Sequence, residues 1–295
     1  MVSAAREAAG RPRRLQAVPI DTGSGPPLLL VHGQPGSGAD WAGVAELLSG
    51  SFRVLAPDRP GWGAHPRPAT TLAGNASALE RMLAAKDVTA ERGVIVVGHS
   101  LGGGIALELA LSRPGLVRVL VLVGSVGVRS ALTSLDRLLA VPLVGDGVLR
   151  AGRAALSRAA RTAGRLSRLS SVERAVERAA RLPAVRAVMA EGDRTMDGRD
   201  RRSFLVEQRA LIEETPGIER RLPTLRLPVA VLQGAADHIV RPSAAADLAG
   251  AIPGAELVLR ERAGHRLPFE QPDLVAEVVR RYAALGRLVG SSRAG

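Results

Sequence analysis

The chain has 295 residues, enough for one large α/β domain with or without an insertion. Its composition, 46% hydrophobic and 23% charged, is typical of a soluble globular protein. No apolar run approaches the roughly 18 residues that a membrane-spanning helix needs. The absence of cysteine excludes disulfides, thiolate metal sites and cysteine nucleophiles. Because no apolar segment follows the arginines of the N-terminus, we predict no secretory signal and expect a cytoplasmic protein.

The net charge of +12 comes almost entirely from arginine, since Lys86 is the one lysine. A basic surface attracts nucleic acid or anionic lipid. Aromatic residues make up only 2% of the chain, however, which leaves few side chains for stacking on single-stranded bases. No helix-turn-helix or zinc-ligand spacing accompanies the charge. We therefore expect no nucleic-acid partner.

Short apolar runs alternate with stretches of helical spacing in two parts of the chain. The predicted strands are Leu28–Val31, Phe52–Ala56, Val94–Val97, Val117–Val123, Val229–Leu232 and Glu256–Leu259. The predicted helices between and after them are Asp40–Leu48, Leu72–Val88, Leu101–Ser112, Ser243–Ala251 and Pro272–Leu288. Continuous apolar strands separated by helices indicate buried parallel strands with crossover helices. The pattern predicts a doubly wound, mostly parallel α/β fold.

Between these parts, residues 125–227 contain no convincing strand and are rich in arginine, alanine and leucine. Ser170 and Glu173 have capping-box spacing for a helix that Pro183 would end. We interpret the segment as an all-helical lid over an active site. The predicted organisation is a flexible tail at 1–13, a core of 14–124 and 228–288, the lid at 125–227, and a flexible tail at 289–295.

The strongest local signal is the G-x-S-x-G pattern of Gly98-His99-Ser100-Leu101-Gly102, between a predicted strand and a predicted helix. A serine on such a sharp turn needs small residues on both sides, which Gly98, Gly102 and Gly103 supply. Ser100 is the candidate nucleophile. The N–H of Leu101, at the start of the helix, is a candidate oxyanion donor.

A second glycine-rich bend, His32-Gly33-Gln34-Pro35-Gly36, follows the strand Leu28–Val31. Such a bend lets backbone N–H groups approach the substrate of the nucleophile. Pro35 cannot donate a hydrogen bond, so the N–H of Gln34 is the candidate second oxyanion donor. We interpret His32, Gly33 and His99 as structural support of the site.

Asp237 and His265 complete a candidate catalytic triad. Asp237 follows the strand Val229–Leu232, where a carboxylate can face an imidazole, although an aspartate there also suits a simple turn. His265 lies in the loop after Glu256–Leu259. The order serine, aspartate, histidine is the one that an α/β-hydrolase requires. We predict that His265 is the general base and that Asp237 orients it, and we interpret His238 as a bystander.

These motifs resemble the α/β-hydrolase superfamily, with the resemblance covering Asp21–Gly124 and Pro228–Ala284. Two further segments carry it: Asp21–Pro27 is similar to the family's entry to its third strand, and Pro57–Gly63 to the loop after its fourth. The resemblance implies a serine hydrolase with a lid. One departure is the short N-terminus, which leaves room for one leading strand near Arg14–Ile20 where the family often has a hairpin.

A serine nucleophile with a base and an oxyanion hole implies acyl transfer. Relatives that resemble haloalkane dehalogenases and epoxide hydrolases use an aspartate in place of Ser100, and the epoxide hydrolases need lid tyrosines, whereas the one tyrosine here is Tyr282. We predict hydrolysis of a carboxylic ester or lactone of a small apolar substrate. Amides, thioesters and carbon–carbon bonds remain open alternatives, as does a non-catalytic ligand receptor. The mechanism implies no metal and no organic cofactor.

The predicted lid carries arginines on one side of a helix and leucine or alanine on the other. The arginines are Arg150, Arg153, Arg158, Arg161, Arg165 and Arg168. We interpret them first as a solvated face. Peripheral contact with an anionic membrane is the secondary interpretation, since aromatic anchors are lacking. The sequence does not determine the oligomeric state.

Overall fold

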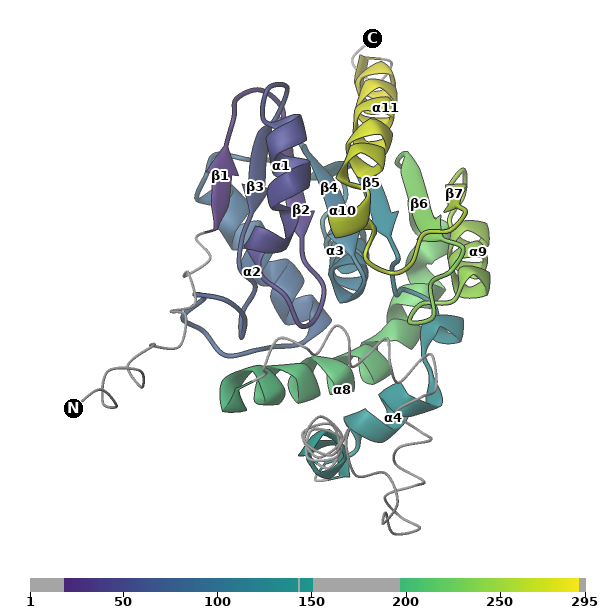
Figure 1. The fold of residues 1–295 in the computed structure, drawn as a ribbon. Coiled ribbons are helices and arrows are strands. Elements are labelled where there is room, and N and C mark those ends of the chain that lie inside the picture. The colour runs from purple at the N-terminus through teal and green to yellow at the C-terminus, as the bar shows by residue number, and fades with distance from the viewer. Residues whose placement is uncertain (1–18, 143, 151–196, 292–295) are drawn as a thin grey trace, which may run out of the picture.

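The computed structural model describes residues 19–142, 144–150 and 197–291, and within them seven strands form one sheet (Figure 1). The order across the sheet is β1-β3-β2-β4-β5-β6-β7. The strands are β1 (Ile20–Thr22), β2 (Pro27–Val31), β3 (Arg53–Ala56), β4 (Val94–His99), β5 (Val117–Val123), β6 (Val229–Gly234) and β7 (Glu256–Arg260). All neighbouring strands pair in parallel except β1, which is antiparallel to β3. The predicted doubly wound, mostly parallel sheet is therefore confirmed.

Helices cover both faces of this sheet, which explains why its central strands are apolar on both sides. One face packs against α1 (Ala42–Leu48) and α11 (Pro272–Ser291). The other packs against α2 (Leu72–Ala84), α3 (Leu101–Ser112) and α9 (Pro242–Ala251). Within β2, Leu28 and Leu30 contact the first group while Leu29 and Val31 contact the second. This alternation is the period-two geometry of a strand buried between two layers of helices.

The first strand differs from the expectation. The sequence suggests a leading strand near Arg14–Ile20, whereas β1 spans Ile20–Thr22, and residues 1–18 lie outside the described part of the chain. The helix expected over Asp40–Leu48 is divided into a 3-10 turn, η1 (Gly38–Trp41), and α1. The capping box between Ser37 and Asp40 explains where that turn begins.

Two helices of the expected lid lie together beyond the carboxyl ends of the strands (Figure 1). They are α4 (Ser134–Ala140) and the long α8 (Gly198–Arg221), flanked by the 3-10 turns η2 (Arg129–Ala131) and η3 (Leu222–Thr224). Between residues 125 and 227, the described residues form no strand. The expected capping box at Ser170 and the arginines from Arg153 to Arg168 lie outside the described residues. The bounds of the lid stay a prediction.

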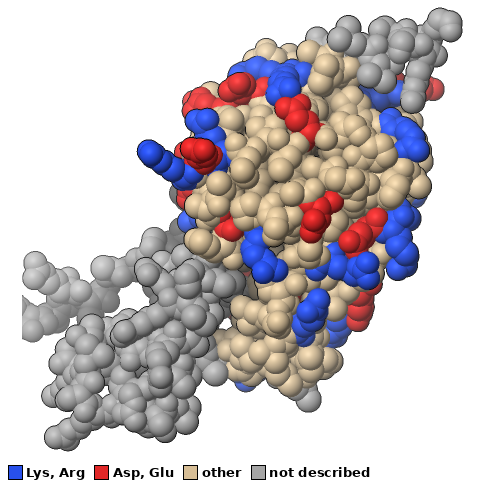
Figure 2. Space-filling model, turned by 90° about the vertical axis from the view of Figure 1, so that its right-hand side faces the viewer, with Lys and Arg blue, Asp and Glu red and all other residues tan. Residues whose placement is uncertain are grey.

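Two features of the described residues concern the expected nucleic-acid and membrane contacts: the charges on one face and the length of the apolar helices. Figure 2 shows the face around β7 and α9, where basic and acidic side chains are interspersed and no large area carries one sign alone. In the described ranges, no helix is long and apolar enough to cross a membrane.

Two helical glycines offer a matched test of how tightly the sheet and α3 pack. A Cβ on Gly102, in α3, would stand 2.3 Å from the carbonyl oxygen of Val31, whereas a Cβ on Gly250, in α9, meets no atom within 4 Å. We expect Gly102→Ala to lower the free energy of unfolding by about 3 kcal/mol, because backbone must move. Gly250→Ala should raise it by about 0.5–1 kcal/mol through helix propensity. Urea unfolding measures both, and equal effects of the two substitutions would contradict this packing.

Candidate active site

Ser100 occupies a sharp turn between β4 and α3. Its backbone has φ 54° and ψ −122°, a conformation that non-glycine residues rarely adopt and that surrounding structure must impose. The N–H of Ser100 donates to the carbonyl of Val123 at 3.0 Å, and the carbonyl of Ser100 accepts from the N–H of Gly103 at 3.0 Å. The first bond ties the turn to the end of β5, and the second ties it to the first turn of α3.

Glycines give this turn the room that the sequence pattern indicates. A Cβ on Gly98 would lie 2.5 Å from the carbonyl oxygen of Gly102. A Cβ on Gly33 would lie 3.0 Å from the Cβ of Ser100, so the glycine-rich bend after β2 passes directly against the serine. The segment that carries Gln34 therefore lies against the turn that carries Ser100 and Leu101.

Asp237 and His265 form a buried pair at the end of β6. The Nδ1 of His265 lies 2.7 Å from the Oδ2 of Asp237, and the Oδ1 of Asp237 accepts from the N–H groups of Ile239 at 2.8 Å and Val240 at 2.9 Å. Gln233, on β6, donates to Oδ2 at 3.0 Å. Burial opposes ionisation of this carboxyl, yet the hydrogen bonds from His265 and its other donors hold the pKa of Asp237 below its usual value.

Gly124 lies between the turn of Ser100 and the pair of Asp237 and His265. It directly follows Val123, to which Ser100 is bonded, and its N–H donates to Leu232 of β6 at 2.9 Å. A Cβ on Gly124 would lie 3.2 Å from the Nδ1 of His265 and 3.3 Å from the Oδ2 of Asp237. Val123 and Gly124 at the end of β5 thus lie between the turn of Ser100 and the pair of Asp237 and His265, all at one edge of the sheet.

His99 supports the loop that carries His265. Its Nε2 lies 2.9 Å from the carbonyl oxygen of His265, and the two rings are 4.9 Å apart between centroids. Burial lowers the pKa of His99 to about 3, with the neighbouring His265 acting in the same direction. A neutral His99 donates one hydrogen bond from Nε2, which fits the carbonyl acceptor.

His32 begins the bend after β2, and its ring contacts the backbone on both sides. The N–H of Arg59 donates to its Nε2 at 3.1 Å, so the ring proton sits on Nδ1, which donates to the carbonyl of Gly33 at 2.8 Å. The guanidinium of Arg59 adds hydrogen bonds to the carbonyls of His32, from Nε at 3.0 Å, and of Gly33, from Nη2 at 2.9 Å. The carbonyl groups of His32 and Gly33 are therefore both held by hydrogen bonds from Arg59.

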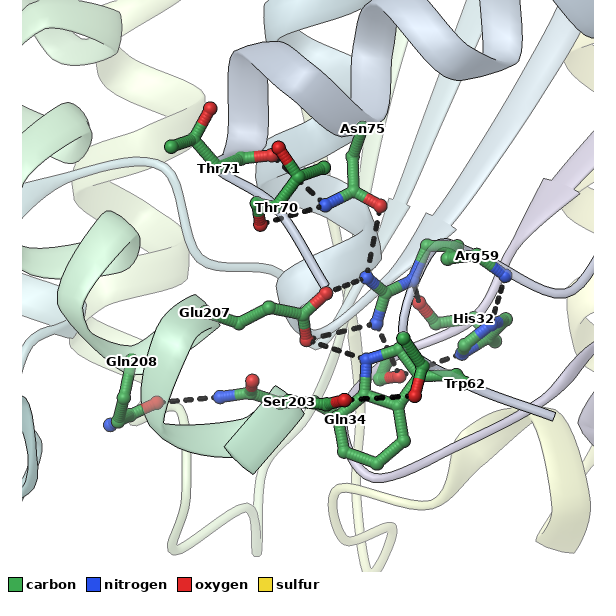
Figure 3. Close-up of polar contacts among 12 residues, drawn as sticks. His32, Gln34, Arg59, Trp62, Thr70, Thr71, Asn75, Ser203, Glu207 and Gln208 are labelled. Carbon is green, nitrogen blue, oxygen red and sulfur yellow. Dashed lines mark hydrogen bonds and ion pairs between the residues drawn. The ribbon is translucent and has the colours of Figure 1, made fainter. Parts of the chain in front are cut away.

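Arg59 is itself held by a carboxylate from the lid, Glu207 on α8 (Figure 3). Neither side chain has any exposed surface. Glu207 accepts from both terminal nitrogens of Arg59 and, at 2.9 Å, from the indole N–H of Trp62. The Oδ1 of Asn75 accepts from Nη1 of Arg59 at 3.4 Å. All five N–H groups of the guanidinium thus have acceptors.

The next residue of α8, Gln208, contacts the same bend through a side chain (Figure 3). The Nε2 of Gln34 donates to the Oε1 of Gln208 at 2.5 Å. The Nε2 of Gln208 in turn donates to the Oδ1 of Asp136, on α4, at 2.6 Å. Two consecutive residues of α8 therefore contact the bend after β2: Glu207 holds its backbone through Arg59, and Gln208 holds the side chain of Gln34.

Local sequence patterns predict the serine, aspartate and histidine segments but not the residues that contact and support them: Arg59, Gly124, Asp136, Glu207 and Gln208. The spacing of apolar residues does indicate that Glu207 and Gln208 are buried. Phe204, Leu211 and Ile218 recur every seven residues, which marks the buried stripe of a helix, and Glu207 and Gln208 fall within it. A charged residue on a buried stripe requires a partner. The sequence alone does not say which of its many arginines supplies that partner.

Comparisons with known proteins agree with this architecture. A model of the alpha/beta hydrolase family matches residues 28–278. An uncharacterised protein of Mycobacterium tuberculosis is 31% identical over 272 residues, which cover 88% of this chain and 76% of that protein. The 2-hydroxymuconate semialdehyde hydrolase of a Pseudomonas strain is 40% identical over 116 residues, 38% of this chain and 41% of that enzyme. A solved thermophilic esterase from Thermogutta terrifontis superposes with a TM-score of 0.66 at 23% identity, covering 91% of this chain and 93% of that one, a likeness of fold.

The depressed pKa of His99 leads to a prediction about acid stability. The unfolded chain binds a proton at His99 as the pH falls through about 6.5, whereas the folded chain binds it only near pH 3. Folding stability therefore decreases as the pH falls between these values, and His99 contributes up to about 1.4 kcal/mol per pH unit to that slope. We expect His99→Gln to have a shallower slope in urea unfolding between pH 6.5 and 4. The control is His238→Gln, at an exposed position, and an identical slope for wild type and His99→Gln would refute the prediction.

Proposed function

The chain belongs to the alpha/beta hydrolase family, and we propose that it is a serine hydrolase that cleaves a carboxylic ester or lactone of a small apolar substrate. Two observations support this proposal: Ser100 lies on a strained, glycine-flanked turn, and His265 and Asp237 form a hydrogen-bonded pair at the same edge of the sheet. Strain at a single buried serine is typical of a nucleophile held in position for attack.

In the proposed reaction, His265 takes the proton from the hydroxyl of Ser100 while the serine oxygen attacks the substrate carbonyl. The tetrahedral intermediate collapses, and the leaving alcohol takes the proton back from His265. Water, activated by the same imidazole, then attacks the acyl-enzyme and releases the acid, returning the proton to Ser100. Asp237 accepts from the Nδ1–H throughout, which keeps Nε2 available as the base and stabilises the imidazolium.

We assign the oxyanion to the N–H groups of Leu101 and Gln34. The contacts of Arg59 support the second of these donors. The carbonyl of Gly33 and the N–H of Gln34 belong to one planar trans peptide unit, so they point in opposite directions. Because Arg59 and His32 hold the carbonyl from one side, the N–H is directed to the other. A hydrogen bond from a cation to the carbonyl also polarises that N–H, which strengthens it as a donor.

Carbon–carbon bond hydrolysis is the second candidate. The 40% identity to a 2-hydroxymuconate semialdehyde hydrolase over 116 residues favours it, although the match covers less than half of either chain. The same three side chains would serve that reaction, as they would amide or thioester hydrolysis. A non-catalytic receptor on the same fold is distinguished from all of these by the absence of an activated serine.

The first test is labelling with a fluorophosphonate, which reacts with activated serines. We expect one adduct on Ser100 in the wild type, located by peptide mapping, and none in Ser100→Ala. Turnover of short p-nitrophenyl esters should fall by about 10⁴-fold or more in the Ser100→Ala and His265→Ala variants. An unlabelled wild type that binds small molecules would support a receptor, and turnover of a dienol ketone but not of esters would support carbon–carbon hydrolysis.

The second test concerns the ion pair that supports Gln34. Glu207→Gln leaves the Arg59 cation buried without its anion, which should lower the free energy of unfolding by about 3–5 kcal/mol. Below the unfolding temperature we expect kcat to fall by up to about 10²-fold with little change in KM, because one oxyanion donor contributes about 10²–10³. Binding of a boronate transition-state analogue should weaken in parallel.

The matched control is Glu219→Gln on the same helix. Glu219 pairs with Arg129 at 2.6 Å, but the arginine is 69% exposed. We therefore expect Glu219→Gln to lower the free energy of unfolding by less than about 1 kcal/mol and to leave kcat unchanged. A Glu207→Gln variant that loses stability but keeps its kcat would show that the buried pair supports the fold and not the oxyanion donor.

A further inference from the structure

Asp136, Gln208 and Gln34 form a relay of hydrogen bonds in which each amide donates to the preceding residue. Asp136 begins it on the lid: its Oδ2 accepts from the N–H of Thr133 at 2.7 Å and from the hydroxyl of Thr133 at 2.6 Å. Its Oδ1 accepts from Gln208. With both oxygens engaged as acceptors, the carboxylate compels the amide of Gln208 to turn its NH2 group toward Asp136.

That orientation determines the next one. Because the NH2 group of Gln208 donates to Asp136, its Oε1 faces Gln34. Gln34 therefore donates to that oxygen from its own NH2 group. The Oε1 of Gln34 is then the end of the relay. Among the described residues no group donates to this oxygen, although it is buried. A buried carbonyl oxygen without a donor costs free energy unless something else supplies one.

The position of this oxygen identifies what can supply the donor. Gln34 is the residue whose N–H we assign to the oxyanion, and the preceding Gly33 lies against the Cβ of Ser100. Gln34 as a residue is only partly buried. Because the bend lies against Ser100, a substrate bound at that serine is the candidate source of a donor to this oxygen.

We propose that the Oε1 of Gln34 is a specificity-determining acceptor, which selects substrates carrying a hydroxyl or N–H donor close to the scissile carbonyl, such as hydroxyacyl esters. The inference rests on the proposed hydrolase function and narrows its substrate class. Asp136 acts as a positioning residue, since it sets the direction of the relay without touching substrate.

The direction of the relay can be reversed by one isosteric change. In Asp136→Asn the side-chain oxygen replaces Oδ2, because two Thr133 donors require an acceptor there, and the NH2 group replaces Oδ1. That NH2 then faces Gln208, whose amide turns and donates to the Oε1 of Gln34. The terminal group of Gln34 becomes an NH2, which binds acceptors in place of donors.

The experiment compares p-nitrophenyl esters of butyrate, of 2- and 3-hydroxybutyrate and of their methoxy analogues. In the wild type, we expect kcat/KM for the better hydroxy ester to exceed that for its methoxy analogue by roughly 10- to 100-fold, the effect of an unmet buried acceptor. In Asp136→Asn this ratio should fall toward one, because the hydroxyl oxygen and the methoxy oxygen both accept from an NH2 group. Gln208→Leu, which breaks the relay, should bring it near one.

The control Asp146→Asn removes a lid carboxylate that binds Arg201 at 2.7 Å and does not touch the relay, so it should keep the wild-type ratio. Hydrolysis of the butyrate ester with a hydroxy-to-methoxy ratio near one in the wild type would overturn the inference and leave the proposed function intact. No turnover of any ester, together with no fluorophosphonate adduct on Ser100, would reject the proposed function and this inference with it.

Discussion

The arrangement of the site depends on the buried ion pair between Arg59 and Glu207. Removing two charges from water costs several kcal/mol per ion, and a well-packed apolar pair is often at least as stable. Stability alone therefore does not account for an arginine and a glutamate with no exposed surface. What the pair supplies is direction, because a guanidinium with five fixed N–H groups can hold two backbone carbonyls and a carboxylate at set angles.

Through this pair α8 and the sheet are joined next to Ser100. Arg59 follows β3 and fixes the bend after β2, while Glu207 comes from α8, 148 residues later in the chain. Ser203, one turn before Glu207, adds a hydrogen bond to the carbonyl of Gly61 at 2.9 Å (Figure 3). The segment from Asp58 to Gly63 is thus held between the oxyanion bend and the lid helix, so neither can shift without the other.

Much of the fold followed from local patterns in the sequence. Strands β2, β4, β5 and β6 are continuous apolar runs, and Gly98 and Gly102 mark the turn at Ser100, so short windows sufficed to predict them. The order of Ser100, Asp237 and His265 then linked three separate windows. Gly124 is different, because its role appears only once β5 is known to lie between β4 and β6. Arg59 and Glu207 are different again, since in a chain with 40 basic residues no local pattern selects one arginine for one glutamate.

The adjacency of Glu207 and Gln208 has a consequence for how this enzyme can change over time. Neighbouring residues on a helix differ by about 100° in direction, and both directions are used here, one for the backbone of the oxyanion bend and one for its side chain. A one-residue insertion between Ser203 and Glu207 would rotate Glu207 and Gln208 by about 100° relative to Ser203, so the contacts of all three residues could not form together. The sequence of α8 and that of the loop around Arg59 therefore constrain one another, and we expect the two to change together.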